Sequence, residues 1–125
     1  MPSRLVYAQL QTLDPAGAKN FYKELCGWTM KDDPPSAGPP YTEALVGAEA
    51  VAGIMPLLEP SGAAHWLLYL SVDDVDTASQ KAERLGAKIL LPPMDISAKA
   101  CRISMLADPS GARFALRGPL SSKHS

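Results

Sequence analysis

The sequence predicts an α+β fold made of two copies of one β-α-β-β-β module, at residues 4–57 and 65–117. Three observations predict it. Strand-like and helix-like patterns follow one another in the same order in both halves. The residues that begin and end the two helices recur at matching positions. One such module is too small to bury its sheet alone, so we expect both to form a single domain of residues 1–125.

The first module opens with a strand and a helix. Residues 4–12 alternate between two faces, as a half-buried strand does. Asp14 is a typical helix N-cap, Pro15 suits the first helical position, and Gly27 suits the helix end. Between them, apolar residues recur at helical spacing: Ala18, Phe21, Tyr22 and Leu25.

Three further strands complete the first module. Residues 28–31 form the first of them. Residues 32–40 contain four prolines and are therefore expected to be a loop. Residues 41–46 and 50–57 are expected to pair across a turn that begins at Gly47.

The second module repeats this order after a loop at residues 58–64. A strand at residues 65–72 leads to a helix that Asp73-Asp74 caps and Gly86 ends. A strand at residues 88–91 follows, and Pro92-Pro93 open a loop at residues 92–99. The module ends with strands at residues 102–107 and 112–117, joined by a turn at residues 108–111.

The two halves match at an offset of 60 residues. Asp14 then meets Asp74 at the helix caps, and one deletion near Cys26 brings Gly27 onto Gly86 at the helix ends. Three apolar pairs also coincide: Leu10 with Leu70, Ala18 with Ala78, and Leu25 with Leu85. Because both the apolar residues and the helix boundaries recur, the halves are interpreted as an internal repeat.

Charge and composition argue against several classes of partner. The 125-residue chain has a formal net charge of −1 with both signs interspersed, so it lacks a basic stripe for nucleic acid or anionic lipid. The N-terminus shows no signal-peptide core, and no apolar run approaches the ~20 residues of a membrane span. We expect a cytoplasmic protein without nucleic-acid or membrane partners, whose tail at residues 118–125 frays.

Familiar catalytic motifs are absent from the sequence. It contains no glycine-rich phosphate loop, no nucleophile elbow and no His/Cys cluster. Cys26 and Cys101 lack CxxC spacing, and each is expected to be a reduced residue of the core or of a pocket wall.

Three segments carry a family resemblance. They are LDPAGAKNFYKELCGW, SVDDVDTASQKAERLGAKIL and LADPSGARFAL. In this order they resemble the first helix, the second helix with its following strand, and the closing hairpin of vicinal-oxygen-chelate proteins. That superfamily includes glyoxalase I, bleomycin-resistance proteins and extradiol dioxygenases. The resemblance implies that the sheets of the two modules form one cup, with the helices outside.

Strand alternation then divides the side chains between the cup and the helices. Those expected to face the cup are Leu5, Tyr7, Gln9, Gln11, His65, Leu67, Tyr69, Ser71, Arg113, Ala115 and Arg117. Those expected to face the helices are Val6, Ala8, Leu10, Trp66, Leu68, Leu70, Phe114 and Leu116.

The resemblance also implies four positions for metal ligands. They correspond to Tyr7, Leu67, Ala115 and a residue within 53–55. Leucine and alanine carry no donor atom, and a neutral tyrosine is a poor ligand for a divalent ion. His65 is the one histidine outside the tail. We therefore expect no metal, no cofactor, and neither standard glyoxalase I nor dioxygenase activity.

Two residues are candidates for acid/base catalysis. His65 lies at the rim of the expected cup, where it serves either proton transfer or a hydrogen bond that closes a loop. Glu43 lies on a strand and is either a base inside the cup or an exposed carboxylate.

Polar and aromatic side chains on the expected cup face suit a flat or aromatic ligand. The alternative is that these side chains simply fill the cup. The expected ligand-binding residues are Tyr7, Gln9, Leu67, Tyr69, Met105 and Arg113.

These observations favour a metal-independent protein that binds a small apolar or aromatic molecule, as the bleomycin-resistance resemblance implies. One alternative is a glyoxalase-like lyase or isomerase that uses acid/base residues or a non-standard metal site. Another is a structural or regulatory dimer module. A homodimer is expected in each case. The ligand, the existence of a reaction, and whether one chain or a dimer forms the cup stay open at this point.

Overall fold

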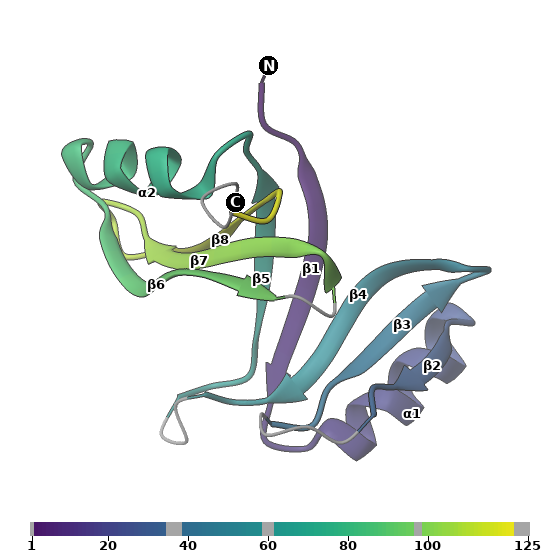
Figure 1. Ribbon diagram of the computed structural model, residues 1–125. Coiled ribbons are helices and arrows are strands. Elements are labelled where there is room, and N and C mark those ends of the chain that lie inside the picture. The colour runs from purple at the N-terminus through teal and green to yellow at the C-terminus, as the bar shows by residue number, and fades with distance from the viewer. Residues whose placement is uncertain (1, 35–38, 59–61, 97–98, 122–125) are drawn as a thin grey trace. The chain divides into compact units, whose positions relative to one another are not determined.

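The computed structural model describes residues 2–34, 39–58, 62–96 and 99–121. The helices and strands follow in the order β1 (Leu5–Thr12), α1 (Pro15–Cys26), β2 (Thr29–Asp32), β3 (Thr42–Val46), β4 (Glu49–Pro56), β5 (His65–Ser71), α2 (Val75–Arg84), β6 (Lys88–Ile96), β7 (Cys101–Ala107) and β8 (Arg113–Gly118) (Figure 1). This is the β-α-β-β-β order twice, so the predicted α+β class is confirmed. Among the described residues, no helix combines the length and apolar character that a membrane span requires.

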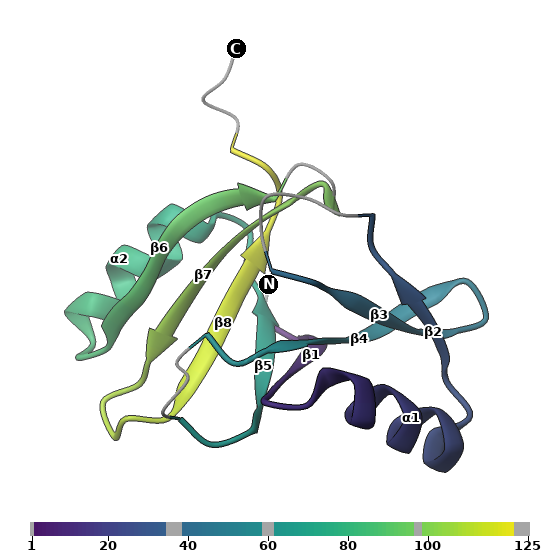
Figure 2. The ribbon, with the colours of Figure 1, turned by 90° about the horizontal axis from the view of Figure 1, so that it is seen from below.

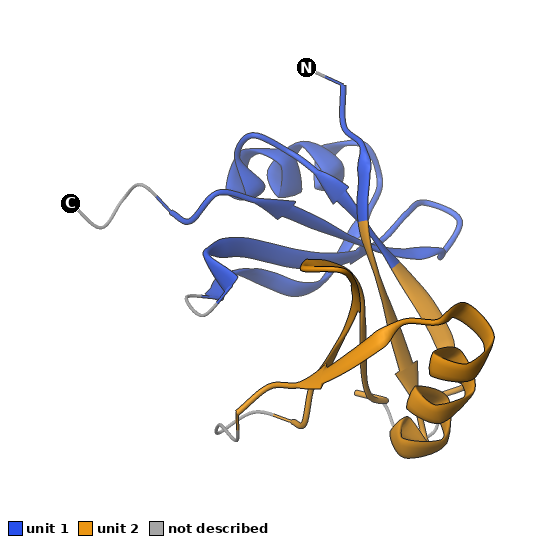
Figure 3. Ribbon diagram, turned by 90° about the vertical axis from the view of Figure 1, so that its right-hand side faces the viewer, with its two compact units in different colours: residues 1–6, 68–125 blue, residues 7–67 orange. Residues whose placement is uncertain are grey.

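The strands are hydrogen-bonded in the order β2-β3-β4-β1-β5-β8-β7-β6. The chain divides into two compact units, unit 1 with residues 1–6 and 68–125, and unit 2 with residues 7–67 (Figure 3). Each unit contains one helix and most of the strands of one predicted module. The unit boundaries fall within β1 and β5, whereas the sequence placed each of these strands whole in one module.

Unit 2 forms around the predicted helix signals. The Asp14 carboxylate accepts a hydrogen bond from the Gly17 amide at 3.0 Å and thereby caps α1. Gly27 ends the helix at φ 73°, a left-handed conformation that glycine adopts without strain. Beneath α1, β4 is parallel to β1 and antiparallel to β3. Leu10 and Ile54 are in register on these strands and are buried.

Unit 1 repeats the arrangement around α2. The Asp74 carboxylate accepts from the Thr77 amide at 3.0 Å, and α2 lies along β6, β7 and β8 (Figure 2). Val75, Leu106 and Leu116 form the buried core beneath the helix. The partly buried residues packed against them include Leu70, Val72, Ala78, Ala82, Ala87, Ile89 and Phe114. The predicted positions of Leu70, Phe114 and Leu116 beneath the helix are therefore confirmed.

A polar pair lies inside this core. The hydroxyls of Ser79 on α2 and Ser104 on β7 are 2.8 Å apart, and both residues are at most 1% exposed. Each hydroxyl satisfies the other, as buried polar groups require. The described part of the chain contains no buried side-chain nitrogen or oxygen without a hydrogen-bond partner.

The predicted loop at residues 92–99 is wrong for its first half. Pro92 and Pro93 lie inside β6, between register shifts that begin at Ile89 and end at Met94. The strand tolerates them because β6 is last in the strand order, where a missing backbone N–H breaks no second ladder. Residues 97–98 lie outside the described part of the chain, as do residues 35–38 and 59–61 of the other two predicted loops.

Three residues expected to face the helix of their own module lie elsewhere. Val6 and Leu68 are 43% and 46% exposed. Trp66 contacts Tyr22 of α1, with ring centroids 5.4 Å apart. The reason is that β1 and β5 each have residues in both units, so that Trp66 belongs to the unit of α1. The prediction for the two cysteines is confirmed for one of them. Cys101 is buried as predicted, whereas Cys26 at the end of α1 is exposed.

Part of the expected frayed tail is hydrogen-bonded. Gly118 belongs to β8, and the Ser121 amide donates to Asp95 at 3.1 Å. Arg102 of β7 donates one hydrogen bond to the Asp95 carboxylate of β6 and two to the Asp76 carboxylate of α2. These carboxylates, Asp76 foremost, raise the pKa of Arg102. The expectation of fraying concerns residues 122–125, which lie outside the described part of the chain.

The turn before β8 makes stability depend on pH. The Asp108 carboxylate accepts hydrogen bonds from the Ser110 hydroxyl at 2.7 Å and the Ala112 amide at 3.0 Å. These bonds, the Ser110 hydroxyl first, lower the pKa of Asp108. A lowered folded-state pKa means that the ionised carboxylate stabilises the fold above the unfolded pKa of about 4, and that this stability is lost as pH falls through the folded pKa.

We therefore expect Asp108→Asn to flatten the fall in Tm below about pH 4, because the asparagine has no proton to gain. Melting curves of the wild type and the variant between about pH 2 and 7 check this. Asp73→Asn, an exposed aspartate before α2, is the matched control. Equal slopes for the wild type and Asp108→Asn would contradict the prediction.

Candidate functional site

One face of the unit 2 sheet collects polar side chains. Gln9 of β1 and Glu43 of β3 are both in register with Gly53 of β4, so the three residues share a face. Tyr7 and Gln11 share it by alternation along β1. Ile54 lies on the opposite face, which α1 covers.

Four side chains on this face form a continuous series of hydrogen bonds, named the Tyr–Gln chain. The hydroxyls of Tyr7 and Tyr41 are 2.7 Å apart. The side-chain amide of Gln9 donates from Nε2 to the Tyr41 hydroxyl at 3.3 Å. The side-chain Nε2 of Gln11 donates to the side-chain Oε1 of Gln9 at 3.0 Å. Gln9 and Gln11 are 5% and 4% exposed, whereas both phenols are half-buried. The buried amides therefore hold two more accessible hydroxyls in place.

Gly53 makes room for the two phenols. A Cβ atom at this position would overlap the Tyr41 hydroxyl and approach the Tyr7 hydroxyl within 2.5 Å. Position 53 therefore requires glycine because a larger residue would overlap the phenols. Its backbone conformation does not require glycine, since Gly53 does not have a positive φ.

Within the resemblance, the strand register makes Gly53 the counterpart of Ala115 and so the expected fourth ligand position. Gln9 pairs with Gly53 in unit 2, and Tyr69 pairs with Ala115 in unit 1. Because Gln9 and Tyr69 are 60 residues apart, Gly53 corresponds to Ala115 in the repeat. This narrows the predicted range of residues 53–55 to one residue.

The residues at the four positions do not fit a divalent metal. Tyr7, Gly53, Leu67 and Ala115 offer one side-chain donor atom among them, a phenol oxygen. Leu67 and Ala115 are at most 2% exposed. The described residues also contain no group of three His, Cys, Asp or Glu side chains placed to hold a metal ion.

The two acid/base candidates have different surroundings. His65 Nδ1 lies 2.9 Å from the Ala63 carbonyl oxygen, the backbone contact that was one of the two alternatives for this residue. Glu43 is half-buried and shares the face of Gly53 and the Tyr–Gln chain. The structure therefore brings Glu43, and not His65, into register with this group.

Three other predicted ligand-binding residues lie together in unit 1. They are Tyr69, Met105 and Arg113. Ala115 of β8 is in register with Tyr69 of β5 and with Met105 of β7, and Arg113 shares the face of Ala115 by alternation along β8. Tyr69 is buried, Met105 is half-buried and Arg113 is exposed. Their part in ligand binding stays a prediction, as does the cup formed by both modules.

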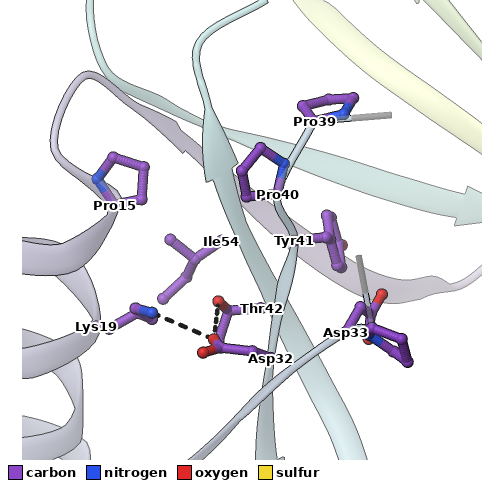
Figure 4. Close-up of a pocket in the computed structure, with 10 residues that line it drawn as sticks. Pro15, Lys19, Asp32, Asp33, Pro39, Pro40, Tyr41, Thr42 and Ile54 are labelled. Carbon is purple, nitrogen blue, oxygen red and sulfur yellow. Dashed lines mark hydrogen bonds and ion pairs between the residues drawn. The ribbon is translucent and has the colours of Figure 1, made fainter. Parts of the chain in front are cut away.

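A pocket of about 380 Å³ lies beside the start of α1 (Figure 4). Tyr41 of the Tyr–Gln chain is among the residues that line it, together with Pro15, Lys19, Thr42 and Ile54. Its polar groups bind one another: Asp32 accepts from Thr42 at 2.6 Å and from Lys19 at 3.2 Å. The Thr42 hydroxyl, and then Lys19, lower the pKa of Asp32. These contacts tie α1 to β2 and β3. The Tyr–Gln chain is the stronger candidate site because Tyr7, and Gly53 beneath the two phenols, stand at two of the four ligand positions that the family resemblance implies.

A family model for the Glyoxalase/Bleomycin resistance protein/Dioxygenase superfamily matches residues 4–116. The chain belongs to this superfamily. The resemblance in the sequence is thereby confirmed, and the eight strands and two helices of the described residues agree with the superfamily's fold.

Two curated relatives match nearly the whole chain. "Putative glyoxylase CFP32" of Mycobacterium tuberculosis is 40% identical over 129 residues, which cover 93% of this chain and 48% of that protein. "Anthracycline biosynthesis protein DnrV" of Streptomyces peucetius is 29% identical over 131 residues, covering 92% and 46%. The chain thus spans about half the length of the curated relatives it matches.

Solved structures of the superfamily support the fold. Methylmalonyl-CoA epimerase of Streptomyces coelicolor has a TM-score of 0.69 and 13% identity, covering 97% of this chain and 100% of that one. The epimerase of Mycobacterium tuberculosis has a TM-score of 0.68 and 16% identity, covering 94% and 88%. At these identities the likeness shows the fold alone.

Proposed function

We propose that the chain binds a small apolar or aromatic molecule without a metal ion, and that the Tyr–Gln chain orients this molecule. The observation that carries the proposal is the pair of phenols over Gly53, where Tyr7 and Gly53 stand at ligand positions that the family resemblance implies. In place of a charged metal, this arrangement presents hydroxyls that both donate and accept hydrogen bonds. A small number of fixed polar groups that set the orientation of the ligand is typical of small-molecule sites.

The burial of Gln9 and Gln11 supports a role in orientation. Both amides are nearly inaccessible and hydrogen-bonded, so they fix the position of the Tyr41 hydroxyl before a ligand arrives. A preorganised group loses less entropy on binding than a mobile one. The ligand class is in keeping with the name of DnrV, a relative named for anthracycline biosynthesis. A flat aromatic anthracycline is therefore the first probe for this site.

We expect Tyr41→Phe to weaken binding of an anthracycline probe about fivefold to tenfold, since one hydrogen bond contributes about 1 kcal/mol. Fluorescence titration of the probe measures the change, and circular dichroism verifies the fold. Tyr22→Phe is the matched control, because Tyr22 lies on α1 and outside the Tyr–Gln chain. An unchanged affinity in Tyr41→Phe, or an equal loss in Tyr22→Phe, would count against the site.

Metal independence has its own test. Protein purified without an affinity tag is analysed for bound elements, before and after incubation with Zn, Ni, Mn and Fe(II). The proposal requires substoichiometric metal and an unchanged Tm with each ion. One equivalent of any metal, with a raised Tm, would overturn this part of the proposal.

Acid/base catalysis by a lyase or isomerase is the second candidate function. Two observations favour it: Glu43 shares the face of the Tyr–Gln chain, and CFP32 carries a glyoxylase name. Glu43 would accept a proton from a substrate whose oxygen is hydrogen-bonded to the phenols. Its test is the turnover of carbonyl compounds by the wild type, Glu43→Gln and His65→Ala. Turnover that survives Glu43→Gln would exclude this carboxylate as the base.

A further inference from the structure

The pocket beside the start of α1 has the size of a small-molecule site. Its volume of about 380 Å³ lies within the range of roughly 300–1,000 Å³ that such sites occupy. Every residue that lines it belongs to unit 2. The pocket shares only Tyr41 with the Tyr–Gln chain, so a ligand bound here is a second ligand, beyond the proposed function.

Much of the pocket wall is apolar and stiff. Four prolines, Ile54 and Tyr41 contribute to it. Because proline fixes its own φ, such a wall loses little conformational entropy when a ligand binds. Ile54 and Thr42 are 1% and 6% exposed, so they lie at the inner end of the pocket. An apolar or aromatic ring therefore has a matching surface to pack against.

The charged side chains in the pocket lining favour a cation. They are Lys19, Asp32 and Asp33, one ammonium group against two carboxylates, which leaves a net charge of −1. The Thr42 hydroxyl, and then Lys19, lower the pKa of Asp32, so that this carboxylate is ionised at neutral pH. A cavity whose lining has a net negative charge attracts positively charged molecules and repels anions.

Asp32 also has an oxygen atom that is open to a ligand. Lys19 Nζ and the Thr42 hydroxyl both donate to Oδ1, at 3.2 Å and 2.6 Å (Figure 4). Among the described residues, none donates to Oδ2. The Asp32 side chain is 69% exposed, so a ligand in the pocket can reach this oxygen. A carboxylate oxygen of this kind accepts a charge-assisted hydrogen bond from an ammonium group.

The two features together define the class of ligand. An ion pair between exposed groups contributes little affinity by itself, so contact with the apolar wall must supply the rest. An amine attached to a ring can make both interactions, whereas a bare cation can make only the first. A carboxylate attached to the same ring would meet the net negative charge of the lining.

We propose that this pocket binds a primary amine carried on an aromatic or other apolar ring, with the ammonium group on Asp32 Oδ2 and the ring against the proline wall. Lys19 holds the carboxylate of Asp32 in place through Oδ1. At the same time its own positive charge repels the amine, so Lys19 and Asp32 have opposite effects on affinity.

The first test uses 2-phenylethylamine, which is protonated at neutral pH, and follows backbone amide shifts by two-dimensional NMR. We expect the amides of Lys19, Asp32 and Thr42 to shift, with a Kd on the order of 1 mM. The analogues 2-phenylethanol and 3-phenylpropionate carry the same ring with a neutral or a negative group, and each should bind at least about threefold more weakly. Equal or tighter binding of either analogue, or shifts confined to other amides, would overturn the proposal.

Two variants separate recognition by Asp32 from a change in the fold, because both Asp32→Asn and Lys19→Met break the ion pair between α1 and β2. We expect the Kd for 2-phenylethylamine to rise about threefold or more in Asp32→Asn, and not to rise in Lys19→Met. Asp73→Asn, which removes an exposed carboxylate of unit 1, is the matched control and should leave the Kd unchanged. A rise in both pocket variants, no rise in Asp32→Asn, or an equal rise in the control would refute the proposal.

Discussion

Gly53→Ala is expected to destabilise the protein by about 1–3 kcal/mol and to abolish ligand orientation by the Tyr–Gln chain. The added methyl group would overlap the Tyr41 hydroxyl, which accepts a hydrogen bond from the buried Gln9 amide. The phenol must then move, and the Gln9 amide loses a hydrogen-bond acceptor. A buried donor left unsatisfied adds about 1–3 kcal/mol of its own.

A double-mutant cycle tests this cause. The destabilisation by Gly53→Ala is measured by urea denaturation in the wild type and in Tyr41→Phe, which lacks the overlapping hydroxyl. We expect the substitution to be at least ~0.5 kcal/mol less destabilising in Tyr41→Phe, the coupling typical of residues in contact. Equal destabilisation in both backgrounds would mean that the cost comes from the Tyr41 ring carbon Cζ and the Tyr7 hydroxyl, which Tyr41→Phe leaves in place, and not from the Tyr41 hydroxyl.

Leu106→Ala is expected to destabilise the protein by about 2–5 kcal/mol. Leu106 is fully buried beneath α2 together with Val75 and Leu116, so that truncation removes apolar contacts and leaves a cavity. The expected loss is a large fraction of the stability of a domain of this size.

Urea denaturation followed by circular dichroism measures the loss. Leu85→Ala is the matched control: it removes the same atoms from a side chain that is 69% exposed, and we expect a change within about 0.5 kcal/mol. A similar change in both variants would contradict the burial of Leu106. A changed m-value would indicate that unit 1 no longer unfolds in the same transition.

The parts of the fold that depend on local chemistry were predictable from the sequence. Asp14 and Asp74 cap their helices through their own carboxylates, and Gly27 ends α1 in a left-handed conformation. Each of these contacts lies within four residues of its donor or acceptor, so the sequence alone contains the cause. The repeat in the sequence then predicted the second half from the first.

The errors concern residues whose surroundings come from elsewhere in the chain. Pro92 and Pro93 indicate a loop unless the strand is known to be an edge, and edge position is set by the pairing of distant strands. Trp66 alternates correctly with its neighbours, but β5 continues into the other unit, so it meets α1.

The candidate site was predicted in part. Tyr7 and Gln9 were identified by alternation along β1, but Tyr41 was treated only as the first residue of a strand after a proline-rich loop. Its hydroxyl joins Tyr7 to Gln9 only because Gly53 leaves space between β1 and β3. The available signal was a glycine at one of the implied ligand positions, in register with Gln9 and Glu43, and it can be interpreted only once the register is known.

The two prolines of β6 have a consequence for how copies of this chain can associate. A strand at the end of a sheet is a template on which another chain can add its own strand, and repeated addition produces fibrils. Pro92 and Pro93 have no backbone N–H to offer an added strand, and the flanking register shifts make this edge irregular. Growth by strand addition is thus disfavoured at β6, one of the two ends of the strand order.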